Sequence, residues 1–354
     1  MKNNKPDELT GVKEIARRAN VSIGTVDRVL HNRQGVSLAT RDKILAIIKE
    51  LDYQPNILAR RLASKKVLTI AVLIPSVSDE TDYWSAPLSG IEEAALEVKT
   101  YGIVIDKYFF DLNDKKTFHK QIDNILKNQV DGVLMAPMHI EESRLFADAC
   151  SEKNIPCVFI NSDIPGQKSL CYIGPDLHHS GSLGAHLIHY LVSDKDQVLI
   201  VNISKDIDNL HHLLRKEEGF REYFKKNNYN IPLIKIDIRD TDYLSVKKTL
   251  LGVLNKNEIK AIFVTNSRVF SVARFLEETN TTDIKLVGYD FLENNVEYLK
   301  KGTIEFLISQ KPKEQGYKGI MTLYNYLVHE TVIDKTYFMP IDILTKENYS
   351  FYKN

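Results

Sequence analysis

The chain has 354 residues, of which 43% are hydrophobic and 27% charged, a composition typical of a soluble globular protein with two or three domains. It has no apolar run of the about 18 residues that a membrane-spanning helix needs, and its first residues lack the apolar core of an export signal, so we expect a cytoplasmic protein without membrane contact. The net charge is zero, but residues 1–66 hold 14 Lys and Arg against 7 Asp and Glu, whereas the rest holds 33 against 40, which favours a polyanionic partner for the first part.

Two short helices with a tight turn between them are predicted near the amino terminus. Val12–Ala19 and Val21–Leu30 are separated only by Asn20, and Ser22 can cap the second helix. Both have an apolar stripe with a spacing of three or four residues. The stripe residues are Ile15, Ala16 and Ala19 in the first helix and Val26, Val29 and Leu30 in the second. The pattern indicates a helix-turn-helix, whose second helix normally enters the major groove of DNA; an ordinary helical hairpin is the alternative.

A third helix is predicted after Ser37, and a longer motif extends through position 62. Its residues are Ile15-Ala16, Val21-Ser22, Thr25-Val26, Arg28-Val29, Val36-Ser37, Thr40-Arg41, Tyr53, Pro55-Asn56, Ala59-Arg60 and Leu62. In this order and spacing they resemble the headpiece and hinge of the lactose-repressor/galactose-repressor (LacI/GalR) family of transcriptional regulators. The resemblance extends more loosely over the rest of the chain.

The resemblance implies contacts with double-stranded DNA. The residues it places there are Ser22, Ile23, Gly24, Thr25, Asp27, Arg28 and His31 in the headpiece and Asn56, Ala59, Arg60 and Leu62 in the hinge. Arg28 could bind the O6 and N7 atoms of guanine, and Leu62 could open a base step in the minor groove, or instead pack on the body of the protein. Asp27 stands where the family commonly has Ser, and it could either accept a bond from cytosine or hold Arg28 in place.

Beyond Val67, apolar runs of strand length alternate with helical patterns. This alternation predicts α/β architecture with parallel sheets flanked by helices. Two such series suggest two lobes with a cleft between them, and the resemblance implies a periplasmic-binding-protein type I fold. We therefore expect a headpiece over residues 1–54, a hinge helix over 55–66 and an effector-binding and dimerisation domain over 67–354. The first lobe is expected to comprise about 67–162 and 311–329, and the second about 163–310 and 330–354.

Polar and aromatic side chains follow the predicted strands, where ligands bind in such sheets. The candidate effector-binding residues are Tyr83, Trp84, Asp163, Lys216, Asn266, Asp290 and Gln310. Several of these match effector positions of the family, but Lys216 replaces an Arg and cannot make the same two-pronged contact. Short polar groups with aromatics suit a sugar. Each residue could instead serve a loop or a cap, and Trp84 could belong to the core.

Catalytic and metal-binding patterns are missing from the sequence. It has no Gly-rich phosphate loop, no nucleophile elbow and no paired His-Glu zinc signature, so we expect no enzyme, no cofactor and no metal. Gly181 and Gly184 lie inside a helical pattern and favour close packing, and the three cysteines are expected to be reduced core thiols. The sequence thus predicts a homodimeric or larger regulator, a repressor of carbohydrate-utilisation genes that binds a near-palindromic operator and a sugar effector. A cytoplasmic sugar sensor without DNA-binding activity is the alternative.

Overall fold

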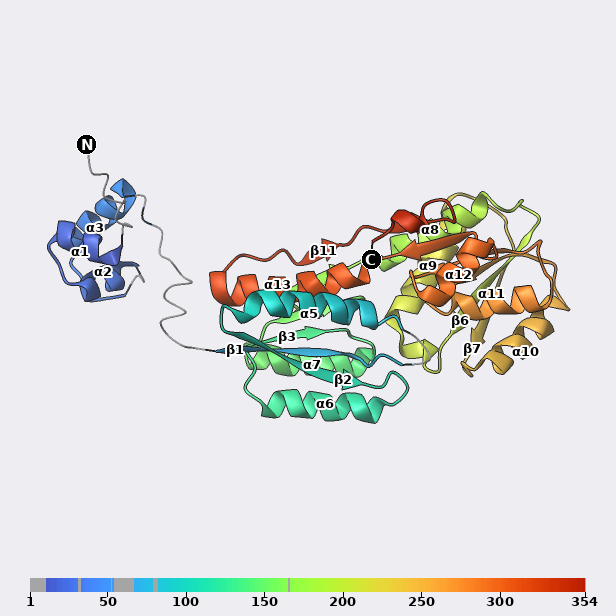
Figure 1. Ribbon diagram of the computed structural model, residues 1–354, viewed down its shortest axis with the longest axis horizontal. Coiled ribbons are helices and arrows are strands. Elements are labelled where there is room, and N and C mark those ends of the chain that lie inside the picture. The colour runs from blue at the N-terminus through green and yellow to red at the C-terminus, as the bar shows by residue number, and fades with distance from the viewer. Residues whose placement is uncertain are drawn as a thin grey trace, which may run out of the picture. The chain divides into compact units, whose positions relative to one another are not determined.

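The computed structural model of the protein describes residues 11–30, 33–51, 53, 67–78, 82–164 and 166–353. The chain divides into two compact units, Met1–Ser64 and Lys65–Asn354, which Figure 1 shows with helices α1–α3 in the first and all labelled strands in the second. The predicted contacts of His31 and of the hinge residues Asn56, Ala59, Arg60 and Leu62 lie outside the described residues.

The first unit is built from three helices around a small apolar core. They are α1 (Val12–Ala19), α2 (Ile23–Leu30) and α3 (Leu38–Glu50). Asn20 ends α1 in the left-handed conformation, with φ of 56°. Ser22 and Ser37 cap the next two helices as predicted, because their hydroxyls accept bonds from the Thr25 and Thr40 backbone N–H groups at 3.1 and 3.3 Å. The buried core consists of Ile15, Ala16, Ala19, Val26, Val29, Ile44 and Ile47.

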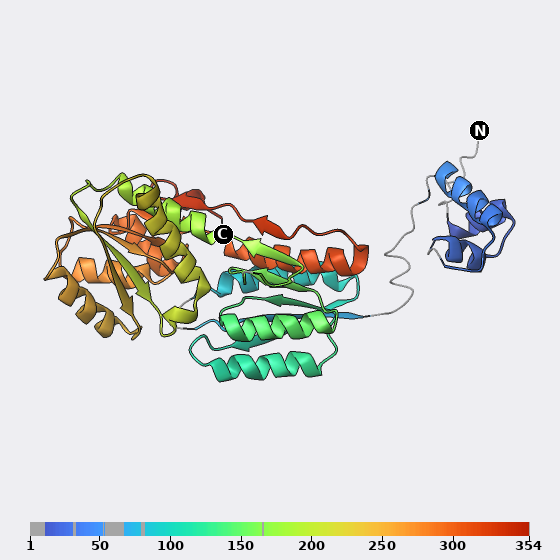
Figure 2. The same ribbon diagram turned by 180° about the vertical axis from the view of Figure 1, so that it is seen from behind.

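The second unit contains two six-stranded sheets, of which the first is wholly parallel. Its strand order is β11-β5-β4-β3-β1-β2. The strands are β1 (Leu68–Pro75), β2 (Ile103–Phe110), β3 (Gly132–Met135), β4 (Cys157–Ile160), β5 (Cys171–Gly174) and β11 (Thr336–Phe338). Helices α5 (Ser85–Lys99) and α13 (Pro312–His329) cover one face, and α6 (Lys115–Lys127) and α7 (Ile140–Glu152) cover the other (Figures 1 and 2).

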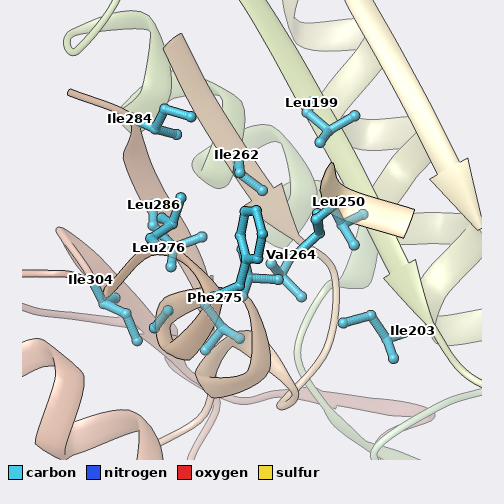
Figure 3. Close-up of a cluster of buried hydrophobic side chains, with 14 of the residues drawn as sticks. Leu199, Ile203, Leu250, Ile262, Val264, Phe275, Leu276, Ile284, Leu286 and Ile304 are labelled. Atoms are coloured by element: carbon cyan, nitrogen blue, oxygen red, sulfur yellow. The ribbon is translucent and has the colours of Figure 1, made fainter. Parts of the chain in front are cut away.

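The second sheet has the order β12-β10-β9-β8-β6-β7 and is parallel except for β12. Its strands are β6 (Gln197–Ile203), β7 (Leu233–Ile238), β8 (Ile259–Val264), β9 (Lys285–Tyr289), β10 (Phe306–Ser309) and β12 (Asp342–Leu344). Its helices are α8 (Leu177–His189), α9 (His211–Lys226), α10 (Tyr243–Leu254), α11 (Val269–Glu278) and α12 (Glu293–Lys301), with short turns η1 (Ile207–Asn209) and η2 (Tyr349–Phe351). Figure 3 shows Phe275 of α11 packed among strand residues such as Ile262 and Val264.

The predicted lobe boundaries at 163 and 330 are wrong. Strand β5 pairs with β4 and strand β11 pairs with β5, so residues 171–174 and 336–338 belong to the first sheet. The chain therefore crosses to the second lobe after Gly174, returns after β10 as predicted, and crosses again between β11 and β12. Both strands are too short to stand out from the surrounding loops in the sequence.

Helices α8 and α9 approach each other closely at two glycines. A Cβ atom on Gly181 would lie 1.9 Å from the Lys216 carbonyl oxygen, and one on Gly219 would lie 1.9 Å from that of His178. The packing interpretation of Gly181 and Gly184 is confirmed, since a Cβ on Gly184 would meet the Phe263 ring at 2.4 Å. The three cysteines are buried and free, as expected. Among the described helices, none has both the length and the apolar character to cross a membrane.

Candidate functional site

The outward face of α2 presents the side chains that the sequence assigns to DNA. Val26 and Val29 face the core, so Gly24 and Arg28 are exposed and Ile23 is 50% exposed. At the start of the helix the Ser22 and Thr25 hydroxyls are bonded at 2.9 Å, where backbone N–H groups and the helix dipole favour a phosphate. Asp27 lies 3.3 Å from the Arg33 guanidinium, which adds a partner that the sequence did not suggest.

A cavity of about 360 Å³ lies between the two lobes of the second unit. Its walls come from the segments that follow the carboxyl ends of the strands in both sheets, with additions from the start of α5 and from α9. Its lining residues include Ser76, Tyr83, Trp84, Asp111, Asn113, Met138, Asn161, Asp206, His212, Lys216, Asn266, Arg268, Asp290 and Gln310. The volume is in the range of pockets for small molecules.

Asp290 is a carboxylate held in the wall of this cavity. It follows β9 with a φ of 74°, a left-handed conformation fixed by Asn295, whose Nδ2 donates to the carbonyl oxygens of Tyr289 and Asp290 at 3.0 Å each. Burial raises the pKa of Asp290 to about 6, although Lys216 and the Gln310 amide, 3.5 Å away, oppose the rise. The carboxylate is 5% exposed, so a ligand that donates hydrogen bonds to it would stabilise its charge.

Lys216 supplies a buried cation to the same wall. Its ammonium group donates to the Thr265 carbonyl oxygen at 3.4 Å and lies 3.7 Å from the centre of the Tyr289 ring. The side chain is only 3% exposed, and burial lowers the pKa of Lys216 to about 8, with Asp290 opposing. Burial, followed by the nearby Lys216, also lowers the pKa of His212 to about 3, so His212 is neutral.

The first lobe contributes aromatic rings and neutral polar groups. The Tyr83 hydroxyl donates to Asn161 Oδ1 at 2.7 Å, and its ring meets Trp84 edge-on at 5.1 Å. Gln315 of α13 joins the lobes, because its Oε1 accepts from the Asn161 backbone N–H at 2.9 Å and its Nε2 donates to the Gln310 carbonyl oxygen at 2.7 Å. The aromatic pair therefore has a fixed place beside the cavity.

A buried amide oxygen of the cavity wall has no hydrogen-bond partner in the described part of the chain. Gln310 Oε1 is buried and makes no hydrogen bond, an arrangement that costs about 1–3 kcal/mol if nothing binds there. With Asp290 and Lys216 nearby, the wall offers acceptors and donors to one guest. Such a set can hold a molecule whose hydroxyl groups both donate and accept.

Six of the seven predicted effector residues line the cavity: Tyr83, Trp84, Lys216, Asn266, Asp290 and Gln310. Asp163 is the exception, because it is not among the residues that line this cavity. Asn161 takes a left-handed conformation with φ of 67° and itself lines the cavity. Asp163 instead lies 3.5 Å from His211 Nδ1, with its side chain 42% exposed.

Several lining residues were missed by the sequence analysis. Asp111 and Asn113 follow β2, so the same rule about strand ends would have found them. His212 and Arg268 line the cavity from the start of α9 and from just before α11, and no motif marks them. In the described part of the chain, no group of three or more His, Cys, Asp or Glu side chains could hold a metal ion.

A two-lobed fold with a cavity at its strand ends, on the same chain as a helix-turn-helix unit, defines a ligand-binding regulator. Residues 70–331 match the family described as periplasmic binding protein domain, and residues 11–56 match bacterial regulatory proteins of the lacI family. The chain belongs to the lacI family of bacterial regulatory proteins, which are transcriptional regulators.

Relatives support this assignment. The chain is 34% identical over 285 residues to catabolite control protein A of Staphylococcus aureus strain Mu50, a match that covers 74% of this chain and 84% of that protein. It is 35% identical over 147 residues to catabolite control protein A of Staphylococcus xylosus, a match that covers 42% of each protein and so less than half of that relative's length. A solved structure assigned as a LacI transcriptional regulator from Bacteroides fragilis has a TM-score of 0.75 and 29% identity, over 81% of this chain and 100% of that one.

Proposed function

We propose that the protein is a cytoplasmic transcriptional repressor that binds a near-palindromic DNA operator as a homodimer and a sugar in its interlobe cavity. The observation that carries the proposal is the buried wall formed by Asp290, Lys216 and Gln310. These three side chains offer a carboxylate, an ammonium group and an unpartnered amide oxygen at one place. A sugar has vicinal hydroxyl groups that can serve all three, and Trp84 can contact an apolar face of its ring.

The DNA side of the proposal depends on the headpiece. Arg28 is exposed on the outward face of α2, where its guanidinium can reach guanine in the major groove. The excess of basic residues in positions 1–66 supplies attraction for phosphate. The name catabolite control protein A, carried by the relatives, favours carbohydrate-utilisation genes as targets.

A sugar can switch DNA binding only if it binds one arrangement of the lobes better than another. A change from a mostly occupied to a mostly free operator requires several kcal/mol of such preference. The cavity has groups from both lobes in its wall, so closure around a guest would supply a preference of this kind.

The first experiment measures the melting temperature of the full chain with a panel of neutral monosaccharides, sugar acids and sugar phosphates. We expect at least one to raise it, and we expect Asp290→Ala to remove the effect. A sugar that stabilises both proteins equally would place the binding site elsewhere.

The second experiment is a gel shift with genomic DNA fragments. We expect retention of a small set of fragments, with an affinity that falls steeply as salt rises, by a logarithmic slope of about −0.9 for each phosphate neutralised. Retention of no fragment at low salt would favour a sugar sensor without DNA-binding activity.

A further inference from the structure

The cleft between the lobes is bridged by charged side chains at the edge far from the chain crossings. The crossings leave β5, β10 and β11, which lie at or next to one edge of each sheet, whereas β2 and β7 lie at the opposite edges and β6 lies next to β7. Lys115 opens α6 directly after β2, and Asp206 follows β6. Figure 1 shows α6 on the side of the first lobe away from α13 and β11. A rotation of the lobes about the crossings would separate them most at the edge where these residues lie.

Asp206 contacts the first lobe there through Lys115. The Lys115 ammonium lies 3.5 Å from Asp206 Oδ2 and 3.6 Å from Glu142 Oε1 of its own lobe. When the lobes separate, Lys115 loses Asp206 but keeps Glu142. The pair across the cleft therefore favours closure, and Glu142 competes with it.

His139 of the first lobe also lies near Asp206 and has buried ring nitrogens without a hydrogen bond to a described residue. It is 1% exposed, lies beside the Phe118 ring and has no hydrogen bond from either ring nitrogen to a described residue. Its Nδ1 is 3.8 Å from Asp206 Oδ2, so a further closure of roughly 1 Å would bring the two atoms within hydrogen-bonding distance. Burial lowers the pKa of His139, and its neutral ring can donate this bond without adding charge.

Asp206 also lines the cavity, whereas Lys115 is not part of the lining. We propose that Lys115 and Asp206 form a latch across the open edge of the cleft, which His139 completes on full closure, and that Asp206 thereby links an occupied cavity to the closed arrangement of the lobes. This inference rests on the proposed function, because the latch matters only if a guest in the cavity controls the lobes.

The test measures the distance between the lobes without any ligand. Spin labels on Lys120→Cys in α6 and Asp240→Cys after β7 occupy exposed positions on different lobes, and the three native cysteines are buried. Pulsed electron–electron double resonance on the full chain then gives the distribution of distances between the two labels. Lys115→Met and Glu142→Gln are compared with the native side chains, and Lys116→Met, which removes an exposed neighbouring cation, is the matched control.

We expect Lys115→Met to raise the ratio of long to short distances by about two- to fivefold, the effect of a partly exposed ion pair. Glu142→Gln should lower this ratio, because a neutral amide competes less well with Asp206 for the Lys115 ammonium group. Lys116→Met should leave the distribution unchanged. A distribution for Lys115→Met that equals the native one, or a shift of Glu142→Gln in the same direction as Lys115→Met, would overturn the latch.

The outcome is separate from that of the sugar panel. The distances are measured without ligand, so they remain valid if no sugar of the panel binds; that result would contradict the proposed function only. If a sugar binds but Lys115→Met has the same distance distribution as the native protein, the latch alone is contradicted.

Discussion

The headpiece and the cavity use charge in opposite ways. In the headpiece the candidate side chains, such as Arg28 and Ile23, are exposed on a small helical scaffold. In the cavity Lys216 and Asp290 are almost fully buried, and burial shifts their pKa values toward neutrality. Exposed basic side chains suit a large polyanion, because they replace the counterions bound to its phosphates. Buried charges instead require a small ligand that pairs or hydrogen-bonds with them. The two units are therefore expected to respond differently to salt, pH and substitution.

The largest effect is expected from the removal of the buried carboxylate. Asp290→Ala should weaken the binding of any sugar identified in the panel by about 100-fold or more, because a hydrogen bond to a buried charge contributes about 1.5–3 kcal/mol and the guest would use more than one. Isothermal titration calorimetry measures the change. Asp283→Ala, at an exposed carboxylate paired with Lys260, is the control and should leave the affinity unchanged.

The contact between α8 and α9 should be nearly as sensitive. Gly181→Ala should lower the free energy of unfolding by about 1–3 kcal/mol, because its Cβ would overlap the Lys216 carbonyl oxygen and the helices must move apart. Gly252→Ala is a matched control in α10 with open space around it, and it should raise stability by about 0.5–1 kcal/mol. Urea unfolding monitors both variants, and equal effects would contradict the close approach.

The headpiece should respond to a single exposed side chain. Arg28→Ala should reduce the preference for operator over unrelated DNA by about 1–3 kcal/mol, the contribution of a two-pronged contact with guanine. Lys43→Ala, at an exposed position of α3, should leave the preference unchanged. Competition binding with labelled operator measures both. If Arg28→Ala keeps the native preference for operator over unrelated DNA, Arg28 does not recognise a base.

A further effect concerns pH and requires no ligand. Burial raises the pKa of Asp290 from its ordinary 3.8 to about 6, so the folded protein binds a proton more tightly than the unfolded chain does. Stability linked to this group is complete below pH 4 and is lost as pH rises through 6, by at most about 2–3 kcal/mol. The free energy of unfolding should therefore decrease less between pH 4.5 and 6.5 in Asp290→Asn than in the native protein. Parallel pH profiles would contradict the burial argument.

Much of the headpiece could be predicted because its signals are local. The caps Ser22 and Ser37 and the stripe of α2 lie within a few residues of the groups they serve. The apolar runs predict strands over Ile103–Phe110, Gly132–Met135, Cys157–Ile160 and Leu233–Ile238, and β2, β3, β4 and β7 have these bounds in the structure. The helical patterns of the sequence begin at Leu88, Ser143 and Ser180, whereas α5, α7 and α8 each begin three residues earlier, because their first turns carry few apolar residues.

The cavity was predictable only in part because it forms between distant segments. The rule about strand ends identified Asp290, Asn266 and Gln310, but it could not tell which residue of a loop faces the cavity. After β4, Asn161 in its left-handed conformation lines the cavity, whereas Asp163 does not. Lys115 and Asp206 are 91 positions apart, and nothing in either segment indicates that they meet.

The central claim is that a guest in the cavity controls how well the headpiece binds DNA. Fluorescence anisotropy with a labelled operator fragment, with and without a saturating sugar from the panel, tests this claim directly. We expect the dissociation constant for DNA to change by about 5- to 150-fold in the native protein, the usual range of coupling between two sites, and to stay constant in Asp290→Ala. A native dissociation constant that is the same with and without the bound sugar would contradict the account.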